Sequence, residues 1–112
     1  MAFDERIAQR VRDILADECP AKERRMFGGL AFMVKGHRCC GIVGADLVIR
    51  VGADAHDQAL SRPHARAMDF TGRPMKGFVY VGPLGYRSTT ALRKWIQRGL
   101  HFVLSLPPKM IL

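Results

Sequence analysis

Two cysteines and a histidine lie together in the stretch His37-Arg38-Cys39-Cys40, and these residue types could support nucleophilic or metal chemistry. A thiol becomes a good nucleophile only with a base such as histidine beside it. A structural metal site needs four ligands at characteristic spacings, and no Cys-x-x-Cys or His-x-x-x-His pattern completes a set with His37 and Cys39. We therefore expect no metal, no cofactor and no catalytic residue, and we expect that the chain is not an enzyme.

A glycine pair follows two arginines in "RRMFGGLAFMV", residues 24–34, and glycines before an element can cradle a phosphate. A phosphate loop of the Walker type also needs a spaced Gly-Lys-Ser/Thr and a helix directly after it. No Gly-Lys-Ser/Thr follows here, and the apolar residues 30–34 after the glycines are typical of a strand and not of a helix. We predict a bend or bulge at the start of the first strand, where missing side chains permit close packing. Met26 and Phe27 are expected in the core, and the arginines before them in solvent.

Basic residues outnumber acidic ones by 18 to 10, and the formal net charge of +8 favours acidic partners such as nucleic acid or an acidic protein surface. Some of the cations lie on the outer face of a predicted C-terminal helix, and others lie in a Gly/Pro loop at residues 72–77. A phosphate-contacting helix and a rigid contact loop would explain them. A solvated helix face and an ordinary turn would explain them as well. The candidate contact residues are Arg24, Arg25, Arg73, Lys76, Arg87, Lys94 and Arg98.

Eight helices and strands, with one turn between the last strand and the last helix, must position these residues. Apolar residues at helical spacing mark the first and last segments, and short apolar runs bounded by glycine and proline mark the strands. The predicted order is helix 4–18, strands 30–34, 39–43 and 47–51, helix 53–61, strands 65–70 and 77–81, a turn at 82–85, and helix 88–106. Asp4 is a suitable cap for the first helix, and Ser88 or Thr89 for the last. This grouping favours an α+β fold with an antiparallel five-stranded sheet and helices on one face.

Two positions carry more specific expectations. Gly99 lies on the apolar stripe of the last helix, where glycine lowers helix propensity, so we expect the helix backbone to touch the sheet there. Cys39 and Cys40 are neighbours in a predicted strand, so their side chains should point to opposite faces. With Cys19 they make an odd number of cysteines, which is a poor disulfide framework. We expect reduced thiols and a cytoplasmic protein.

The remaining sequence features exclude two classes of protein. No apolar run approaches the roughly 18 residues that a membrane span needs. The first six residues have no basic start and lead into no apolar stretch, so they are not a signal peptide. The 112 residues correspond to one domain, and we expect a single domain over 1–112.

Three stretches together resemble the N-terminal domain of the TfoX/Sxy family of bacterial proteins: "RRMFGGLAFMV", "CCGIVGADLVIRVG" and "RPHARAMDFTGRPMKGFVYV". Their most specific parts are residues 25–29, 68–70 and 73–78, and the resemblance runs from about residue 3 to 108. It implies a two-layer fold with an antiparallel sheet in the order α-β(3)-α-β(2)-α. It also implies a link to natural competence, since the namesake proteins act as coactivators with the cyclic-AMP receptor protein. Those regulators carry a C-terminal helical domain, and this chain is expected to be a stand-alone N-terminal domain.

The resemblance and the missing catalytic patterns lead to one main functional expectation. The chain is expected to be a non-enzymatic regulatory domain that acts through protein–protein contacts, with a transcription factor such as a cyclic-AMP receptor protein as the partner that the resemblance implies. Direct nucleic-acid binding through the basic surface is the alternative. A small-molecule or enzymatic role with a pocket beside Cys39 and Cys40 is the third hypothesis. A homodimer that covers the free face of the sheet is also expected.

Overall fold

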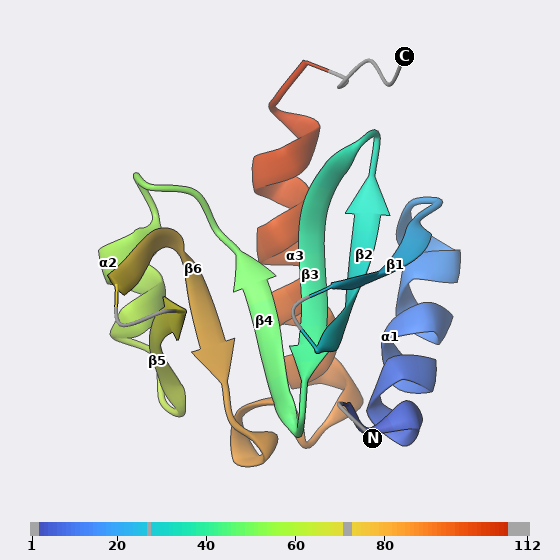
Figure 1. The fold of residues 1–112 in the computed structure, drawn as a ribbon, viewed down its shortest axis with the longest axis horizontal. Coiled ribbons are helices and arrows are strands. Elements are labelled where there is room, and N and C mark those ends of the chain that lie inside the picture. Colours follow the sequence, from blue (N-terminus) through green and yellow to red (C-terminus); the bar gives the residue numbers. More distant parts are fainter. Residues whose placement is uncertain (1–2, 27, 71–72, 108–112) are drawn as a thin grey trace.

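The structure is a computed structural model that describes residues 3–26, 28–70 and 73–107, with the side chains of residues 26 and 68–75 outside the description. Its helices and strands alternate in groups along the chain: a helix, four strands, a short helix, two strands and a last helix (Figure 1). The elements are α1 (Glu5–Glu18), β1 (Lys22–Met26), β2 (Gly29–Val34), β3 (His37–Val43), β4 (Asp46–Arg50), α2 (His56–Leu60), β5 (Ala65–Phe70), β6 (Arg73–Val81), the 3₁₀ turn η1 (Pro83–Tyr86) and α3 (Thr89–Leu104).

The strands form one antiparallel sheet in the order β1-β2-β3-β4-β6-β5. The α+β class and the antiparallel pairing are therefore confirmed, whereas the expected five strands are wrong, because the described residues form six. The additional strand is β1, whose sequence Lys-Glu-Arg-Arg-Met has no apolar alternation. It lies at the edge of the sheet, where charged side chains reach solvent and discourage pairing with another chain.

Helices α1 and α3 are held by the caps and apolar stripes that the sequence predicts. The Asp4 carboxylate accepts a hydrogen bond from the Arg6 backbone N–H, and the Ser88 hydroxyl accepts one from the Ala91 N–H. Such caps satisfy donors that the first turn leaves free. The apolar stripe of α3 is buried at Leu92, Trp95, Ile96, Gly99, Leu100 and Val103.

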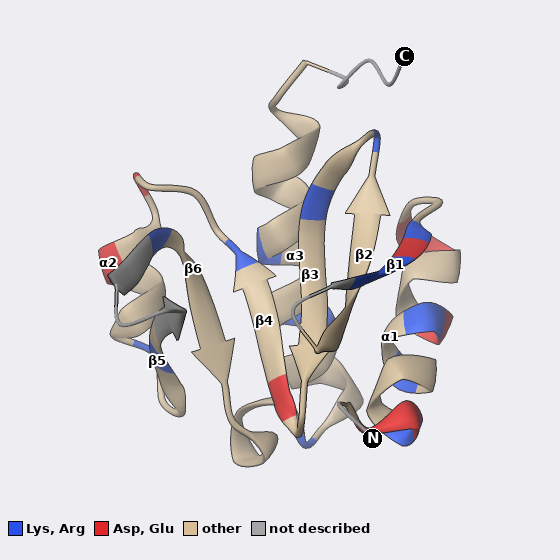
Figure 2. Cartoon of the chain, viewed as in Figure 1, with Lys and Arg blue, Asp and Glu red and all other residues tan. Residues whose placement is uncertain are grey.

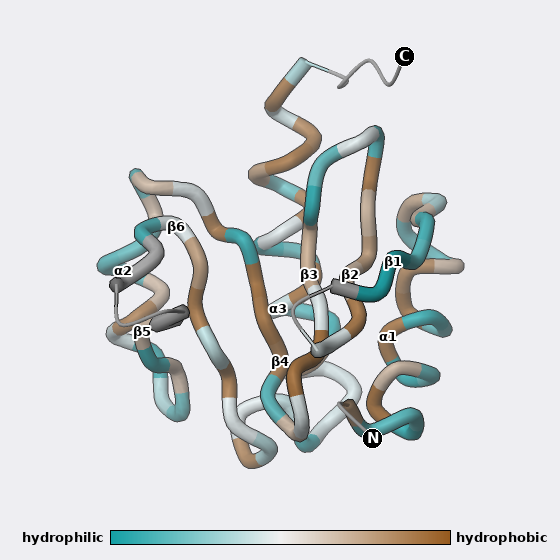
Figure 3. The backbone as a smooth tube through the Cα atoms, viewed as in Figure 1, coloured by the Kyte–Doolittle hydropathy of each residue, from teal (hydrophilic) through white to brown (hydrophobic). Residues whose placement is uncertain are grey.

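The core lies between the helices and one face of the sheet. Figure 1 shows α3 running behind β3 and β4, and α1 beside β2 and β1. In Figure 3 the hydrophobic segments gather on the central strands and on the side of α1 that faces them. The fully buried strand residues on this face include Phe32, Ile42, Leu47, Ile49, Val79 and Val81. Burying side chains of this kind contributes about 1.5–3 kcal/mol each before conformational entropy is counted.

Glycines set the closest approaches of the backbone. A Cβ atom on Gly99 would lie 2.9 Å from the Cys39 carbonyl oxygen, so the expected contact of α3 with the sheet is confirmed. A Cβ on Gly29 would lie 2.3 Å from the Ile42 carbonyl oxygen, which confirms close packing at the glycine pair. This pair joins β1 to β2 and does not open the first strand, and Gly28 has a φ of 72°. The expected burial of Met26 and Phe27 lies outside the described side chains.

A β-bulge changes the arrangement of the two neighbouring cysteines. Phe32 pairs with Cys40 and Met33 pairs with Arg38, which leaves Cys39 as an extra residue in β3. A bulge of this kind breaks the alternation of side chains. Both cysteines are consequently in the core, and the Cys39 thiol makes a hydrogen bond with that of Cys40. The prediction that their side chains point apart is wrong, while all three cysteines are free thiols as expected.

Two further segments differ from the prediction. Residues 73–77 were expected in a loop, but they begin the long strand β6, where Pro74 pairs with β5 beyond the last residue that pairs with β4. A proline is tolerated there because its missing N–H removes no bond to β4. The helix expected at 53–61 is the shorter α2, and the turn expected at 82–85 is part of η1. None of the helices in the described residues is long and apolar enough to cross a bilayer.

Candidate functional site

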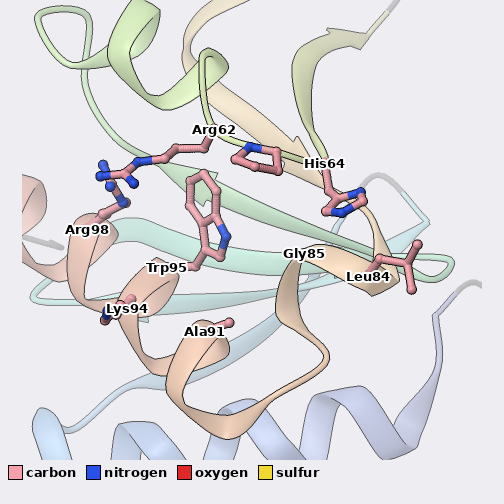
Figure 4. Close-up of a pocket in the computed structure, with 9 residues that line it drawn as sticks. Arg62, His64, Leu84, Gly85, Ala91, Lys94, Trp95 and Arg98 are labelled. Atoms are coloured by element: carbon pink, nitrogen blue, oxygen red, sulfur yellow. The ribbon is translucent and has the colours of Figure 1, made fainter.

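Two adjoining cavities follow the exposed side of α3, and we call them together the α3 groove. The first has a volume of about 280 Å³ and is bounded by residues 62–64, by Leu84 and Gly85, and by α3 (Figure 4). The second, of about 360 Å³, continues toward the C-terminal half of α3, where Gln97 and His101 line it. Lys94 and Arg98 belong to both cavities, so the two form a continuous site.

The rim opposite α3 is fixed by the connection between α2 and β5. His64 has a left-handed backbone with a φ of 68°, and its carbonyl accepts a 3.0 Å hydrogen bond from the Gly82 N–H. A Cβ on Gly85 would lie 2.9 Å from the His64 Cβ and 2.6 Å from a Val81 methyl group. Only glycine fits this approach, so η1 and the segment 62–64 hold one another in place.

Trp95 forms the floor of the first cavity. Its side chain is only 6% exposed, and Figure 4 shows the indole standing between Arg62 and Arg98 on one side and His64 on the other. The guanidinium carbon of Arg98 lies 5.3 Å from the ring centroid, which is a cation–π contact. The indole Nε1–H makes no hydrogen bond to any described residue, and because no buried side-chain N or O atom of those residues lacks a partner, this N–H is open to the cavity and not sealed in the core. The cavity therefore offers a donor to an occupant.

The cations of the groove have no acidic partner among the side chains that the structure describes. The carboxylates of α1 are used elsewhere, since Arg93 pairs with Asp17 at 3.4 Å and with Glu18 at 3.2 Å. Figure 2 shows acidic and basic residues interleaved along α1. Burial, and next the repulsion of Arg62, lower the pKa of Arg98 from its usual value. The groove is thus a concentration of positive charge that an anion would neutralise.

The structure brings two of the seven predicted contact residues into this groove, namely Lys94 and Arg98. The others lie elsewhere, and their role stays a prediction. Arg24 and Arg25 are exposed on β1, with Arg25 over the Phe3 ring at 5.6 Å. Lys76 is exposed on β6, Arg87 is exposed just before the cap of α3, and the side chain of Arg73 is outside the description.

Sequence reasoning missed three residues of the groove. Arg62 and His64 come from the short segment Arg-Pro-His, which directly follows the helix expected at 53–61. Trp95 was assigned to the core, and it is both a core residue and the floor of the cavity. The available signal was a pair of basic side chains around Pro63, but only the fold shows that this segment faces α3.

The thiols do not resemble a reactive site. Cys39 is fully buried, Cys40 is 4% exposed, and the Cys39 Sγ would lie 3.2 Å from a Cβ on Gly99. The hydrogen bond that the Cys40 thiol shares with Cys39, and next burial, hold the pKa of Cys40 well above its usual range, so this thiol stays protonated at neutral pH. Within the described ranges, no three His, Cys, Asp or Glu residues gather where they could hold a metal ion.

Comparison with known proteins gives a match to a family model. Neither the curated proteins nor the solved structures include one similar to this chain. The family model described as the TfoX N-terminal domain matches residues 13–103, which is most of the 112 residues and runs from the second half of α1 to the end of α3. The chain therefore belongs to the TfoX N-terminal domain family.

Proposed function

We propose that this chain is a non-enzymatic regulatory domain that acts by binding a protein partner, in competence-related transcriptional regulation. Family membership supports the regulatory part of the proposal. The partner is an acidic surface of a transcription factor, for which a cyclic-AMP receptor protein is the example that the resemblance implies. The cytoplasmic location expected from the free thiols stays a prediction.

One observation carries the proposal of a binding role, namely that Arg62, Lys94 and Arg98 surround a cavity without an acidic partner in the described chain. Some arginines elsewhere have a carboxylate partner: Arg12 contacts Glu23 at 2.7 Å, and Arg66 contacts Asp46 at 2.5 Å. Cations held together without a counter-charge repel one another. An acidic partner removes this repulsion and gains charge-assisted hydrogen bonds.

The absence of enzymatic activity is part of the same proposal. The protonated, buried thiol of Cys40 is a poor nucleophile. The buried His56 already accepts a hydrogen bond at its Nδ1 from the Gly77 N–H at 3.0 Å. These side chains are explained by packing.

Site-specific photo-crosslinking in the host cell tests the proposal. Leu84 is 64% exposed on the rim of the groove, so a photoreactive residue at this position should trap the partner. Lys22, exposed on β1 at the edge of the sheet, is the matched control position. We expect a protein adduct from position 84 that disappears in the Arg62→Gln/Lys94→Gln variant. Adducts that are equal from both positions, or unchanged in that variant, would contradict the proposal.

Direct nucleic-acid binding is the second candidate, and the unpaired arginines with the +8 charge favour it. If the groove contacts phosphates, the logarithm of the association constant for duplex DNA falls linearly with the logarithm of salt concentration. Removing Arg62 and Lys94 should then lower that slope by about 2. Titrations with duplex and single-stranded DNA at several salt concentrations decide this, and a slope unaffected by the two substitutions excludes phosphate contacts in the groove.

A homodimer is also part of the proposal, because the helices of the described chain cover the sheet from one side (Figure 1). Pairing of two copies about a two-fold axis would cover the other side. Light scattering at micromolar concentration should give twice the chain mass of 12.5 kDa, and a mass of 12.5 kDa would reject the dimer.

A further inference from the structure

We infer that the α3 groove binds an extended acidic segment of a partner protein, with an apolar side chain next to one or more carboxylates. This inference rests on the proposed function and names the chemistry of the partner. Three features carry it: the unpaired cations, the free indole N–H beside an apolar wall, and the length of the groove.

The cations determine the charge of the occupant. Lys94 and Arg98 are one helical turn apart on α3 and line both cavities, while Arg62 approaches Arg98 from the opposite rim (Figure 4). Burial, and next the repulsion of Arg62, lower the pKa of Arg98, as expected for two guanidinium groups on facing rims. A carboxylate between them can accept hydrogen bonds from both sides, and charge-assisted bonds of this kind are the strong ones.

The first cavity also requires an apolar group and a hydrogen-bond acceptor. Trp95, Pro63 and Leu84 supply carbon surface, and Leu84 is 64% exposed although it is a large hydrophobic residue. An apolar side chain of the partner would bury this surface. The Trp95 Nε1–H points into the cavity without a described acceptor, and a peptide carbonyl is suited to it.

The shape of the groove favours a polymer over a single small molecule. Its lining on α3 runs from Ala91 to His101, which is ten residue steps and therefore about 15 Å at a rise of 1.5 Å per residue. An extended peptide advances about 3.3 Å per residue, so about five residues fill this length. In an extended segment that alternates acidic and apolar residues, the two kinds of side chain point to opposite sides. The acidic side chains can then face the cations of the groove, and the apolar ones its apolar wall.

The position of Trp95 disfavours a single-stranded nucleic acid. Binding of that kind uses exposed aromatic faces on which bases stack. Here the ring is 6% exposed and the Arg98 guanidinium already lies against it. A base has no free face to stack on, whereas a side chain can still contact the edge of the indole.

The experiment uses the fluorescence of Trp95, which is the single tryptophan of the chain. The probe is a hexapeptide of alternating glutamate and leucine with both ends blocked, and its neutral match replaces each glutamate by glutamine. We expect a saturable fluorescence change with the acidic peptide and at least tenfold weaker binding of the neutral one. A twelve-base-pair duplex and a single-stranded dodecamer are titrated in parallel.

Two double variants locate the binding. Arg62→Gln/Lys94→Gln removes two cations from the groove, and Arg24→Gln/Lys76→Gln removes two exposed cations outside it, so that both lose the same net charge. We expect the groove variant to bind the acidic peptide at least tenfold more weakly and the control variant to bind within twofold of the parent. Circular dichroism confirms that each variant is folded before titration.

Several outcomes would overturn the inference. These are the absence of saturable binding up to millimolar peptide, equal weakening by the two double variants, equal affinity for the two peptides, or tighter binding of either nucleic acid. If the peptide fails while the adduct from position 84 still depends on Arg62 and Lys94, the inference about the partner's chemistry is wrong and the proposed function stands. If both fail, the groove is not the binding site.

Discussion

Replacing Gly99 by alanine would place a methyl group in the contact between α3 and β3. The new Cβ would lie 2.9 Å from the Cys39 carbonyl oxygen, 3.2 Å from its Sγ and 3.5 Å from an Ile49 methyl group. The carbonyl belongs to the backbone of a central strand, so the helix itself has to move. Overpacking in a core costs about 1–3 kcal/mol, and contact with backbone puts this case in the upper part of that range. Alanine regains about 1 kcal/mol of helix propensity. We therefore expect a net loss of about 1–2 kcal/mol.

Urea unfolding, followed by circular dichroism, measures the change. Lys94 is exposed in the middle of the same helix, and the pair Lys94→Gly and Lys94→Ala gives the propensity difference without a packing clash. Alanine should be the more stable residue at position 94, and glycine the more stable residue at position 99. The close approach of α3 to β3 is refuted if Gly99→Ala raises the free energy of unfolding by as much as the difference between Lys94→Ala and Lys94→Gly.

Two further predictions concern titration and thiol chemistry. Hydrogen bonds from Arg12 hold the pKa of Glu23 below its usual 4.5 in the folded protein, so the unfolded chain takes up this proton first as the pH falls. The stabilisation is complete above about pH 4.5 and disappears as the pH drops through the pKa of Glu23 in the folded protein. The free energy of unfolding should therefore fall less between about pH 7 and 3 in Glu23→Gln than in the parent, by at most about 1 kcal/mol. Identical pH dependence of the two proteins in urea unfolding would contradict this. Of the three cysteines, Cys19 is partly exposed and should react with a thiol reagent in the native protein, whereas Cys39 and Cys40 should react only on unfolding; rapid modification of all three would show that the core site is open.

The helices and the central strands were predictable from local patterns. The stripe and cap of α3 depend on residues within a few positions of each other, and they are found where the sequence predicts them. Strand β1 was missed because an edge strand in solvent needs no apolar face. The prediction that the Cys39 and Cys40 side chains point to opposite faces was wrong because a bulge depends on the register with β2, which no local pattern encodes.

The groove was half predictable for a similar reason. Lys94 and Arg98 stand out from the sequence because they lie four residues apart on the polar side of an amphipathic helix. Arg62 and His64 are about thirty residues away from them and reach the groove only because His64 is tied to Gly82 and η1. The missing hydrogen bond of the Trp95 indole is a property of the packed structure alone.

The central claim is that the α3 groove binds an acidic partner. Amide chemical shifts, measured during a titration with the glutamate–leucine hexapeptide, test this claim most directly. We predict saturable shifts that cluster at residues 62–64, at Leu84 and Gly85, and on α3 from Ala91 to His101, together with the indole N–H of Trp95. A shift of that indole N–H would report its new acceptor. Shifts confined to β1, or spread evenly over exposed cations, would contradict the claim.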